Sequence, residues 1–418
     1  MSAALGVRSR CFVGVASLGL ALAGCGPPAV RVPSPEAPPG TVRVGLAVRV
    51  SQVELRSRGP WRVGASSLTS ALPAGTWLQG RVREGRVELV AAGVVVATDP
   101  QRIQLEPAAS EARLLLAEIP YAGRFELRLD AGQLTVVEEI DLEAYLRGVV
   151  PWEIGRLQPQ ARAAVEAQAI AARTYTVSRL GSYADQGFDV YADERDQVYK
   201  GEQRDDALAN RALEATRGQV LEYRGQLAQA YYSSTCGGHT ACIDNVWPKP
   251  PAAYLRGSRD APPGGASFCR DSRHFRWTEA WSGAQFERML QQTLPRVLNL
   301  PAGSRIGPVA DLRVVTRDPS GRVLDLEVRT TSATYQLRGD SIRWALVPAN
   351  RALLRSLMFD LQLEREGEAI VRVVVRGGGN GHGVGMCQSG AIGMAQAGYD
   401  VDAILQHYYP GTEVHRLR

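Results

Sequence analysis

Residues 159–181 read PQARAAVEAQAIAARTYTVSRLG, and this stretch predicts one long helix. Pro159 suits the first helical turn, where its missing N–H is harmless, and Gly181 suits the C-terminal end. Apolar side chains recur with the helical period on one face, at Ala161, Val165, Ala169, Ala172 and Val177. Because many of these side chains are small, a neighbouring element can approach the helix closely.

The sequence on both sides of this helix is patterned for strands. Between Val42 and Val50, apolar residues occupy alternate positions, which is the period of a strand. Residues 130–132 (DAG) and 318–321 (DPSG) each separate two strand-like runs and predict hairpins. Short helices are predicted at 391–397 and 402–407. The expected fold class is α+β: a mixed β-rich fold with a long helix and short C-terminal helices, preceded by a mostly β N-terminal region.

A chain of 418 residues is too long for one ordinary domain, so we expect two or three packed units. The pattern divides into a signal peptide at 1–24, a Pro-rich tether at 25–40, a mostly β region at 41–120 and a core at 121–418. The formal net charge is +5, without a dense Lys/Arg run or a zinc-finger or basic-helix signature. We therefore expect no nucleic acid as a partner.

The first 25 residues are typical of an exported lipoprotein. A short basic region precedes the apolar run Cys11–Leu22, which is too short to span a bilayer comfortably. Residues 22–25 read LAGC and resemble the bacterial lipobox, so we expect Cys25 to carry the lipid that anchors the protein in a membrane. The alternative is a plain signal peptide with an incidental cysteine. Because Gly26 is not Asp, we expect the outer membrane, facing the periplasm, in a host with two membranes.

One carboxylate precedes the long helix in a setting suited to acid catalysis. Glu153 is predicted on a loop that follows the break at Pro151, and Trp152 and Ile154 flank it. Apolar neighbours disfavour the charged form of a carboxyl group and raise its pKa. A carboxylic acid that is protonated near neutral pH can serve as a general acid, so Glu153 is a candidate catalytic residue. The alternative is an exposed loop residue without a chemical role.

Several further blocks accompany Glu153 in a fixed order. They are EAYLRGVVP at 143–151, QAIAARTY at 168–175, the D-x-x-x-Q-x-Y-x-G segment at 193–201, residues 231–247, and residues 379–398 followed by 407–412. Together they resemble the stage II sporulation protein D (SpoIID/LytB) family over about residues 41–418. The family usually has Pro-Ser-Glu-Met where this chain has PWEI at 151–154. The family's catalytic acid/base maps to Glu153.

The resemblance implies a peptidoglycan lytic transglycosylase. Such an enzyme cleaves the bond between N-acetylmuramic acid and N-acetylglucosamine in glycan strands and leaves 1,6-anhydro ends. One carboxylate suffices because the substrate's own C6 hydroxyl attacks, whereas most glycosidases use two carboxylates. No cofactor is required for this chemistry, and whether the strands must first lose their peptides stays open. The candidate substrate-binding residues are Trp152, Arg173, Tyr175, Ser234 and Gln388. For Arg173, a structural bridge from the helix to a carboxylate is an equal alternative.

Two other functions are alternatives to this enzyme. The family also contains amidase enhancers, which are thought to bind and stimulate another wall hydrolase, so a wall amidase would then be the partner. Trp152 makes this alternative credible because its indole, where the family has a small residue, can narrow the site or stack on a sugar. In the third interpretation, the protein is a structural lipoprotein that tethers the outer membrane to the wall through residues 41–120.

The cysteines allow two interpretations. The run CGGHTAC at 236–242 places two thiols and an imidazole close together, and Cys269 and Cys387 follow. The first interpretation is a structural zinc site, which is also understood to occur in some members of the family, with the ligands Cys236, His239, Cys242 and Cys269. The second is a disulfide formed in an oxidising compartment, in which Cys236 or Cys242 pairs with Cys269 and Cys387 is free or paired.

Overall fold

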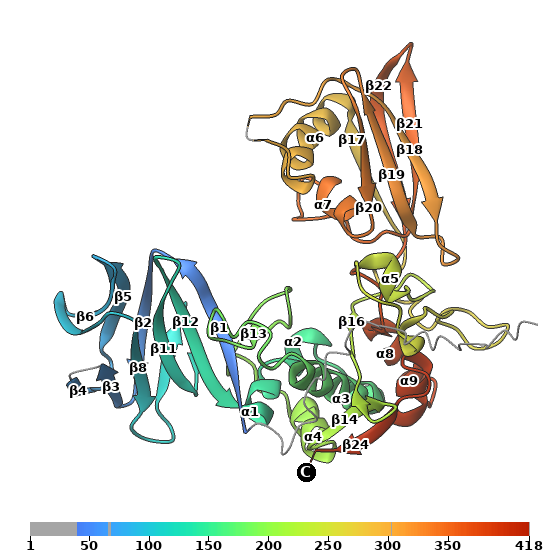
Figure 1. Cartoon of the computed structure of the whole chain (residues 1–418). Coiled ribbons are helices and arrows are strands. Elements are labelled where there is room, and N and C mark those ends of the chain that lie inside the picture. The colour runs from blue at the N-terminus through green and yellow to red at the C-terminus, as the bar shows by residue number, and fades with distance from the viewer. Residues whose placement is uncertain (1–39, 66–67, 302, 418) are drawn as a thin grey trace, which may run out of the picture. The chain divides into compact units, whose positions relative to one another are not determined.

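The computed structural model describes residues 40–65, 68–301 and 303–417 (Figure 1). The predicted signal peptide, Cys25 and the tether up to residue 39 lie outside the described residues. Several sheets and helices are interspersed along the described chain, which confirms the predicted α+β class. Among the described helices, none has the length and apolar character needed to cross a membrane.

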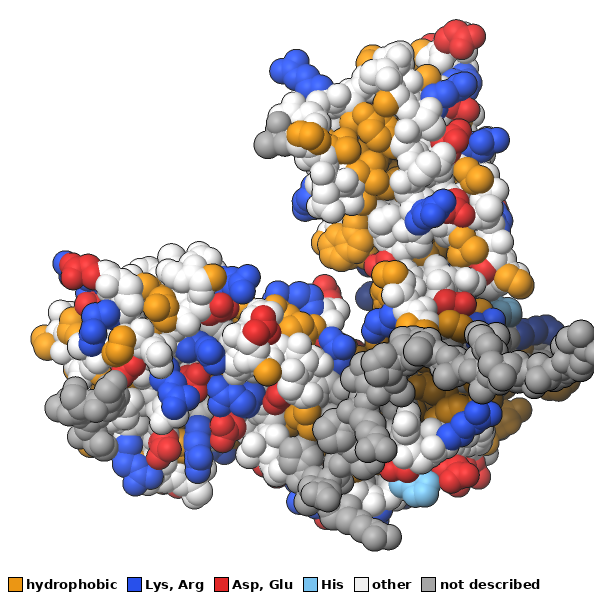
Figure 2. All heavy atoms as spheres, viewed as in Figure 1, with side chains coloured by type: hydrophobic (Ala, Val, Ile, Leu, Met, Phe, Trp, Pro, Cys, Tyr) orange, Lys and Arg blue, Asp and Glu red, His pale blue; other side chains and the backbone are white. Residues whose placement is uncertain are grey.

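Two sheets form the N-terminal part. The first has the strand order β13-β1-β12-β11-β8-β3-β4 and the second the order β10-β9-β2-β5-β6-β7. Their bounds are β1 Thr41–Val50, β2 Gln52–Arg58, β3 Trp61–Ala65, β4 Leu68–Leu72, β5 Trp77–Arg83, β6 Arg86–Ala91, β7 Val94–Asp99, β8 Arg102–Pro107, β9 Arg113–Leu116, β10 Ile119–Tyr121, β11 Arg124–Asp130, β12 Gln133–Asp141 and β13 Val190–Tyr191. Figure 2 shows basic and acidic side chains interspersed over this part, where Arg43 pairs with Glu126 and Glu139.

The hairpin predicted at residues 130–132 forms because the backbone of its turn suits the twist of the strands. Ala131 and Gly132 join β11 to β12, and both have positive φ, 48° and 79°. Glu84 and Gly85 join β5 to β6 in the same way, with φ of 51° and 71°. A two-residue turn with two positive φ angles matches the right-handed twist of a hairpin, and glycine adopts it without steric cost.

The first sheet continues across residue 120, where the sequence analysis divides the β region from the core. β11 pairs with β8 through partners such as Phe125 and Leu105, and β12 pairs with β1. One cluster of buried apolar side chains extends from these strands to the C-terminal helices, from Val42 to Tyr409. Residues 41–120 therefore share their core with the chain that follows them.

A group of helices and short strands follows the first sheet. The helices are α1 Leu142–Arg147, α2 Val150–Glu153, α3 Arg162–Ser178, α4 Ala207–Ala215, α5 Ile243–Val246, α8 Gln388–Gln396 and α9 Val401–Tyr408, with 3₁₀ turns at Pro159–Ala161 and Ala253–Leu255. The strands are β14 Gln219–Tyr223, β15 Gln226–Leu227, β16 Tyr232–Ser233, β23 Met386–Cys387 and β24 Glu413–Arg416. The predicted long helix is α3, which is buried along most of its length among α4, α8, α9 and β14.

A second hydrophobic core lies between Trp277 and Val375, which the sequence analysis did not separate from the rest. Two three-stranded sheets, β17-β22-β21 and β18-β19-β20, enclose it with two helices. The bounds are β17 Trp277–Ser282, α6 Gly283–Val297, β18 Val309–Arg317, β19 Val323–Thr330, β20 Thr334–Arg338, α7 Ser341–Ala345, β21 Phe359–Glu366 and β22 Ala369–Gly377. The start of α6 carries a local signal, since Ser282 and Gln285 form a capping box.

Candidate active site

Glu153 is the last residue of the short helix α2 and not a loop residue as predicted. Its backbone N–H donates to Val149 O at 3.0 Å, and the N–H of Ile154 donates to Val150 O at 3.1 Å. Pro151 does not interrupt this turn because it stands in the first turn of the helix, where a backbone N–H has no intrahelical partner. The helix α2 contacts α3, and Figure 1 shows the two helices next to each other.

The Glu153 carboxyl group is held by two segments that lie far away in the sequence. Its Oε1 accepts a hydrogen bond of 2.7 Å from the backbone N–H of Val198. Its Oε2 lies 3.5 Å from Nε2 of Gln388, the first residue of α8. The residue remains partly exposed, but burial of the carboxyl group raises its pKa to about 7, and these two hydrogen bonds only partly oppose that shift. Glu153 is therefore protonated in a large fraction of molecules at neutral pH.

Gln197 is a buried residue whose side chain forms hydrogen bonds with three hydroxyl groups, two of which belong to tyrosines near Glu153. Gln197 accepts hydrogen bonds from the hydroxyls of Tyr145 at 3.2 Å and Thr176 at 2.7 Å, and it donates one of 2.8 Å to the Tyr232 hydroxyl. Burial, reinforced by the charge of Glu153, raises the pKa of both tyrosines. Both phenols therefore stay neutral near the carboxyl group. Gln197 stands in the D-x-x-x-Q-x-Y-x-G segment, but that pattern by itself indicates no role for its side chain.

Gln388 and Trp152 lie next to the acid, as two of the predicted site residues. The Gln388 side chain donates toward Glu153 and, at 3.3 Å, toward Gln168 of α3. The Trp152 indole stacks on the guanidinium of Arg204, with 3.9 Å between the Arg204 Cζ and the ring centroid, and its buried N–H has no hydrogen-bond partner. Arg204 also donates to Pro151 O at 2.6 Å. Arg204 could not be predicted from the sequence because no local pattern links it to Trp152.

Tyr175 and Ser234 make other contacts. The Tyr175 hydroxyl donates to Asp196 at 2.8 Å, and its ring meets those of Tyr231 and Tyr232 edge to face. The Ser234 hydroxyl lies 3.4 Å from that of Thr235. Neither side chain forms a hydrogen bond with Glu153. That both residues contact the substrate therefore stays a prediction.

Arg173 does not have the geometry of a substrate-binding residue, and this prediction needs correction. Its side chain is fully buried, and its Nε and Nη2 each donate to the Glu143 carboxylate at 2.8 Å. Its Nη1 donates to the carbonyl of Gln219 at 3.1 Å. Since these bonds join α3, α1 and β14 inside the core, Arg173 takes the structural alternative, a bridge from the long helix to a carboxylate.

Comparison with known proteins places this arrangement in a family. A family model described as SpoIID, Stage II sporulation protein, matches residues 130–223, which include Glu153 and Gln197. An uncharacterized protein of Brachyspira hyodysenteriae is 31% identical over 284 residues, which cover 67% of this chain and 68% of that protein. Stage II sporulation protein D of Bacillus subtilis is 29% identical over 294 residues, which cover 66% of this chain and 75% of that protein. The chain belongs to the SpoIID family.

Two further matches extend this comparison. The Amidase enhancer of Bacillus subtilis is 28% identical over 291 residues, which cover 64% of this SpoIID-family chain but only 40% of the enhancer. A model described as a domain of unknown function (DUF8618) matches residues 266–385. That range contains the second hydrophobic core between Trp277 and Val375. The SpoIID match and this second match thus fall on different parts of the fold.

The predicted zinc ligands do not all meet in this SpoIID-family chain. Cys236 and Cys269 lie together, with 3.7 Å between their sulfurs. His239 instead places its Nδ1 2.8 Å from Thr240 O, and the Cys242 thiol donates to the carbonyl of Arg256. His239 and Cys242 therefore do not belong to the group of potential metal ligands, and that part of the prediction is corrected.

Two residues outside the predicted set of zinc ligands lie beside Cys236 and Cys269. Asp260 and Cys387 join Cys236 and Cys269, and one potential ligand atom from each residue lies within 4.8 Å of the others. Three sulfurs and one carboxylate are a donor set that suits zinc. The four cysteines of the described part of the chain are free thiols in this structure.

Proposed function

We propose that this SpoIID-family chain acts on the bacterial cell wall as a peptidoglycan lytic transglycosylase, with Glu153 as its acid and base. The observation that carries the proposal is the Glu153 carboxyl group, whose pKa of about 7 suits proton transfer near neutral pH. The names of the relatives, Stage II sporulation protein D and Amidase enhancer, support a role connected with the wall. The proposed substrate is the bond between N-acetylmuramic acid and N-acetylglucosamine.

The proposed reaction moves one proton out from Glu153 and one proton back. The carboxylic acid donates its proton to the glycosidic oxygen as the bond from that oxygen to the anomeric carbon breaks. The C6 hydroxyl of the same muramic acid then bonds to the anomeric carbon and gives its proton to the Glu153 carboxylate. The products are a 1,6-anhydro end and a free N-acetylglucosamine end, and no water or cofactor is consumed. The attacking hydroxyl belongs to the substrate, so its proximity replaces a second catalytic group.

A hydrolysis with two carboxylates is the alternative reaction at Glu153. Hydrolysing glycosidases place two carboxyl groups within about 10 Å of each other, on opposite sides of the bond. Glu194 is the further carboxylate whose charge raises the pKa of Glu153, and its side chain is exposed. Glu194 is therefore the candidate for a second carboxylate, and its substitution distinguishes the two reactions.

Product analysis tests the proposed reaction. The purified protein is incubated with glycan strands, both intact and stripped of peptides, and the products are analysed by mass spectrometry. We expect 1,6-anhydro muramyl ends, and the comparison of the two substrates shows whether peptides block the site. Reducing muramyl ends would instead identify a hydrolase. Absence of cleavage with both substrates, together with stimulation of an added wall amidase, would identify an enhancer.

Cleavage is expected to decline as the pH rises through about 7. Burial raises the pKa of Glu153 to about 7, and the negative charge of Glu194 adds to this shift. Below that pKa the group holds the proton that an acid must donate, and above it the proton is lost. Because the pKa of Glu153 is higher in the folded than in the unfolded protein, its protonation stabilises the fold. This contribution to the free energy of unfolding is fully present below the unfolded pKa and is lost as the pH rises through 7. A profile of rate against pH checks this, and a rate that stays constant through pH 7 would contradict it.

We also propose that the protein is an exported lipoprotein anchored through Cys25, which the LAGC sequence at 22–25 supports. In a host with two membranes, the anchor would hold the enzyme at the outer membrane, facing the periplasm. Mass spectrometry of the mature N-terminus checks the modification. A mature chain that begins at another residue, or an unmodified Cys25, would refute the anchor.

A further inference from the structure

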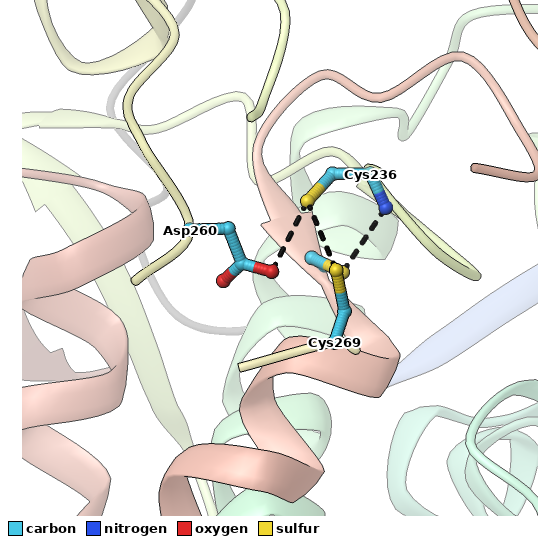
Figure 3. A group of neighbouring side chains, drawn as sticks. Cys236, Asp260 and Cys269 are labelled. Atoms are coloured by element: carbon cyan, nitrogen blue, oxygen red, sulfur yellow. Dashed lines mark hydrogen bonds between the residues drawn. The ribbon is translucent and has the colours of Figure 1, made fainter. Parts of the chain in front are cut away.

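Four buried side chains from separate segments form a compact cluster, and Figure 3 labels three of them. They are Cys236, Asp260, Cys269 and Cys387, and none is more than 1% exposed. The 3.7 Å between the sulfurs of Cys236 and Cys269 is close to the edge of a zinc–thiolate tetrahedron, about 3.8 Å for Zn–S bonds of about 2.3 Å. The cluster therefore has the size of a tetrahedral metal site.

Backbone N–H groups point at two of the sulfurs. The Cys387 sulfur accepts from the N–H of Cys236 at 3.1 Å and from the N–H of Gly390 at 3.3 Å. The Cys236 sulfur accepts from the N–H of Gly238 at 3.4 Å. Hydrogen bonds to a sulfur stabilise its thiolate form, which is the form that binds a metal.

Asp260 is oriented so that one carboxylate oxygen faces the sulfurs. Its Oδ1 accepts a hydrogen bond of 2.7 Å from the Tyr408 hydroxyl, and His407 Nε2 lies 3.8 Å from the same oxygen. Its Oδ2 lies 3.2 Å from the Cys236 sulfur. A hydrogen bond to the oxygen that does not bind the metal is the usual way in which a protein orients a carboxylate ligand.

A bound cation would stabilise the negative charges of the cluster. Three thiolates and one carboxylate would bury four negative charges, which is too costly without compensation. The buried guanidinium of Arg322 supplies one positive charge nearby, since it donates to the carbonyl of Cys236 at 2.8 Å. A divalent cation between the four ligands would offset two more charges.

We propose that Cys236, Asp260, Cys269 and Cys387 bind one zinc ion, and that this ion fixes the start of α8. Four protein ligands leave no open position, so the site is structural and not catalytic. Cys387 caps the N-terminus of α8 and is followed directly by Gln388, which contacts Glu153. The ion therefore connects the segments around residues 236 and 260–269 to the helix that positions Gln388.

Metal analysis of the full chain tests this site without any assay of activity. We expect about one zinc ion per chain, and tetrahedral thiolate absorption after replacement by Co²⁺. Cys387→Ser and Asp260→Asn are expected to lose most of the bound metal. Asp260→Asn keeps the shape of the side chain, so it remains informative if Cys387→Ser does not fold. The matched control is Cys242→Ser, which removes a thiol outside the cluster and is expected to keep the metal.

Three results would overturn the site. The first is a reduced and folded protein that binds neither Zn²⁺ nor Co²⁺. The second is a disulfide between Cys236 and Cys269 in protein isolated from the cell. The third is loss of metal in Cys242→Ser with retention in Cys387→Ser.

The role of the ion at α8 rests on the proposed function and has its own readout. Chelation is expected to slow glycan cleavage, whereas Glu153→Gln is expected to retain its zinc. A protein that binds zinc but does not cleave glycan would support the zinc site and refute only the proposed enzyme activity. Unchanged cleavage after complete removal of the metal would refute the role at α8.

Discussion

Replacing Glu153 by Gln is expected to slow glycan cleavage on the order of a thousandfold, within the range that general acid–base catalysis supplies. Glutamine has nearly the same shape, and its carbonyl oxygen can still accept the hydrogen bond from the Val198 N–H. It holds no proton that it can donate to the glycosidic oxygen. We therefore expect folding and glycan binding to remain close to those of the unchanged protein. The rate of formation of 1,6-anhydro ends, measured beside a glycan-binding assay, checks this.

The control for this variant is Glu194→Gln. It removes the exposed carboxylate that acts electrostatically on Glu153, so it should lower the pKa of Glu153 and change the rate only a few-fold near neutral pH. A loss in Glu194→Gln as large as that in Glu153→Gln would indicate a mechanism with two carboxylates. Full activity in Glu153→Gln would remove the residue from the mechanism.

Replacing Arg173 by Ala is expected to lower the free energy of unfolding by about 3–5 kcal/mol, the usual cost of breaking a buried ion pair. The substitution leaves the Glu143 carboxylate, which is 12% exposed, without its two hydrogen bonds from the guanidinium. It also frees the carbonyl of Gln219 from its bond to Arg173. The midpoint of denaturant unfolding, followed by circular dichroism, measures the change.

Arg162→Ala is the matched control on the same helix. Arg162 pairs with Glu166 one turn away, but its side chain is 65% exposed, and such surface pairs contribute less than about 1 kcal/mol. The double variant Glu143→Met with Arg173→Met should recover part of the loss, because it removes both buried charges together. An Arg173→Ala protein of unchanged stability that no longer binds glycan would restore Arg173 to the substrate site.

Local interactions explain why much of the fold could be predicted. The alternation between Val42 and Val50, the turn at Ala131 and Gly132, and the long helix α3 each depend on residues within a few positions of one another. The prediction of Glu153 as the candidate acid came from its immediate neighbours and the family resemblance. The prediction of a loop after Pro151 was wrong, because the effect of a proline depends on whether it stands in the first turn of a helix or in the helix interior.

By itself, the sequence determined the fold class, the family and the candidate acid, because these depend on local patterns and ordered motifs. Only the tertiary structure decided which distant side chains meet. Gln388 reaches Glu153 across 235 positions, and Cys387 reaches Cys236 across 151. Conversely, the run CGGHTAC bends at Gly237 and Gly238, whose φ angles are 79° and 107°, and His239 and Cys242 bond elsewhere. Ligand sets and carboxyl pKa values depend on spatial neighbours and burial, which packing of the whole chain creates.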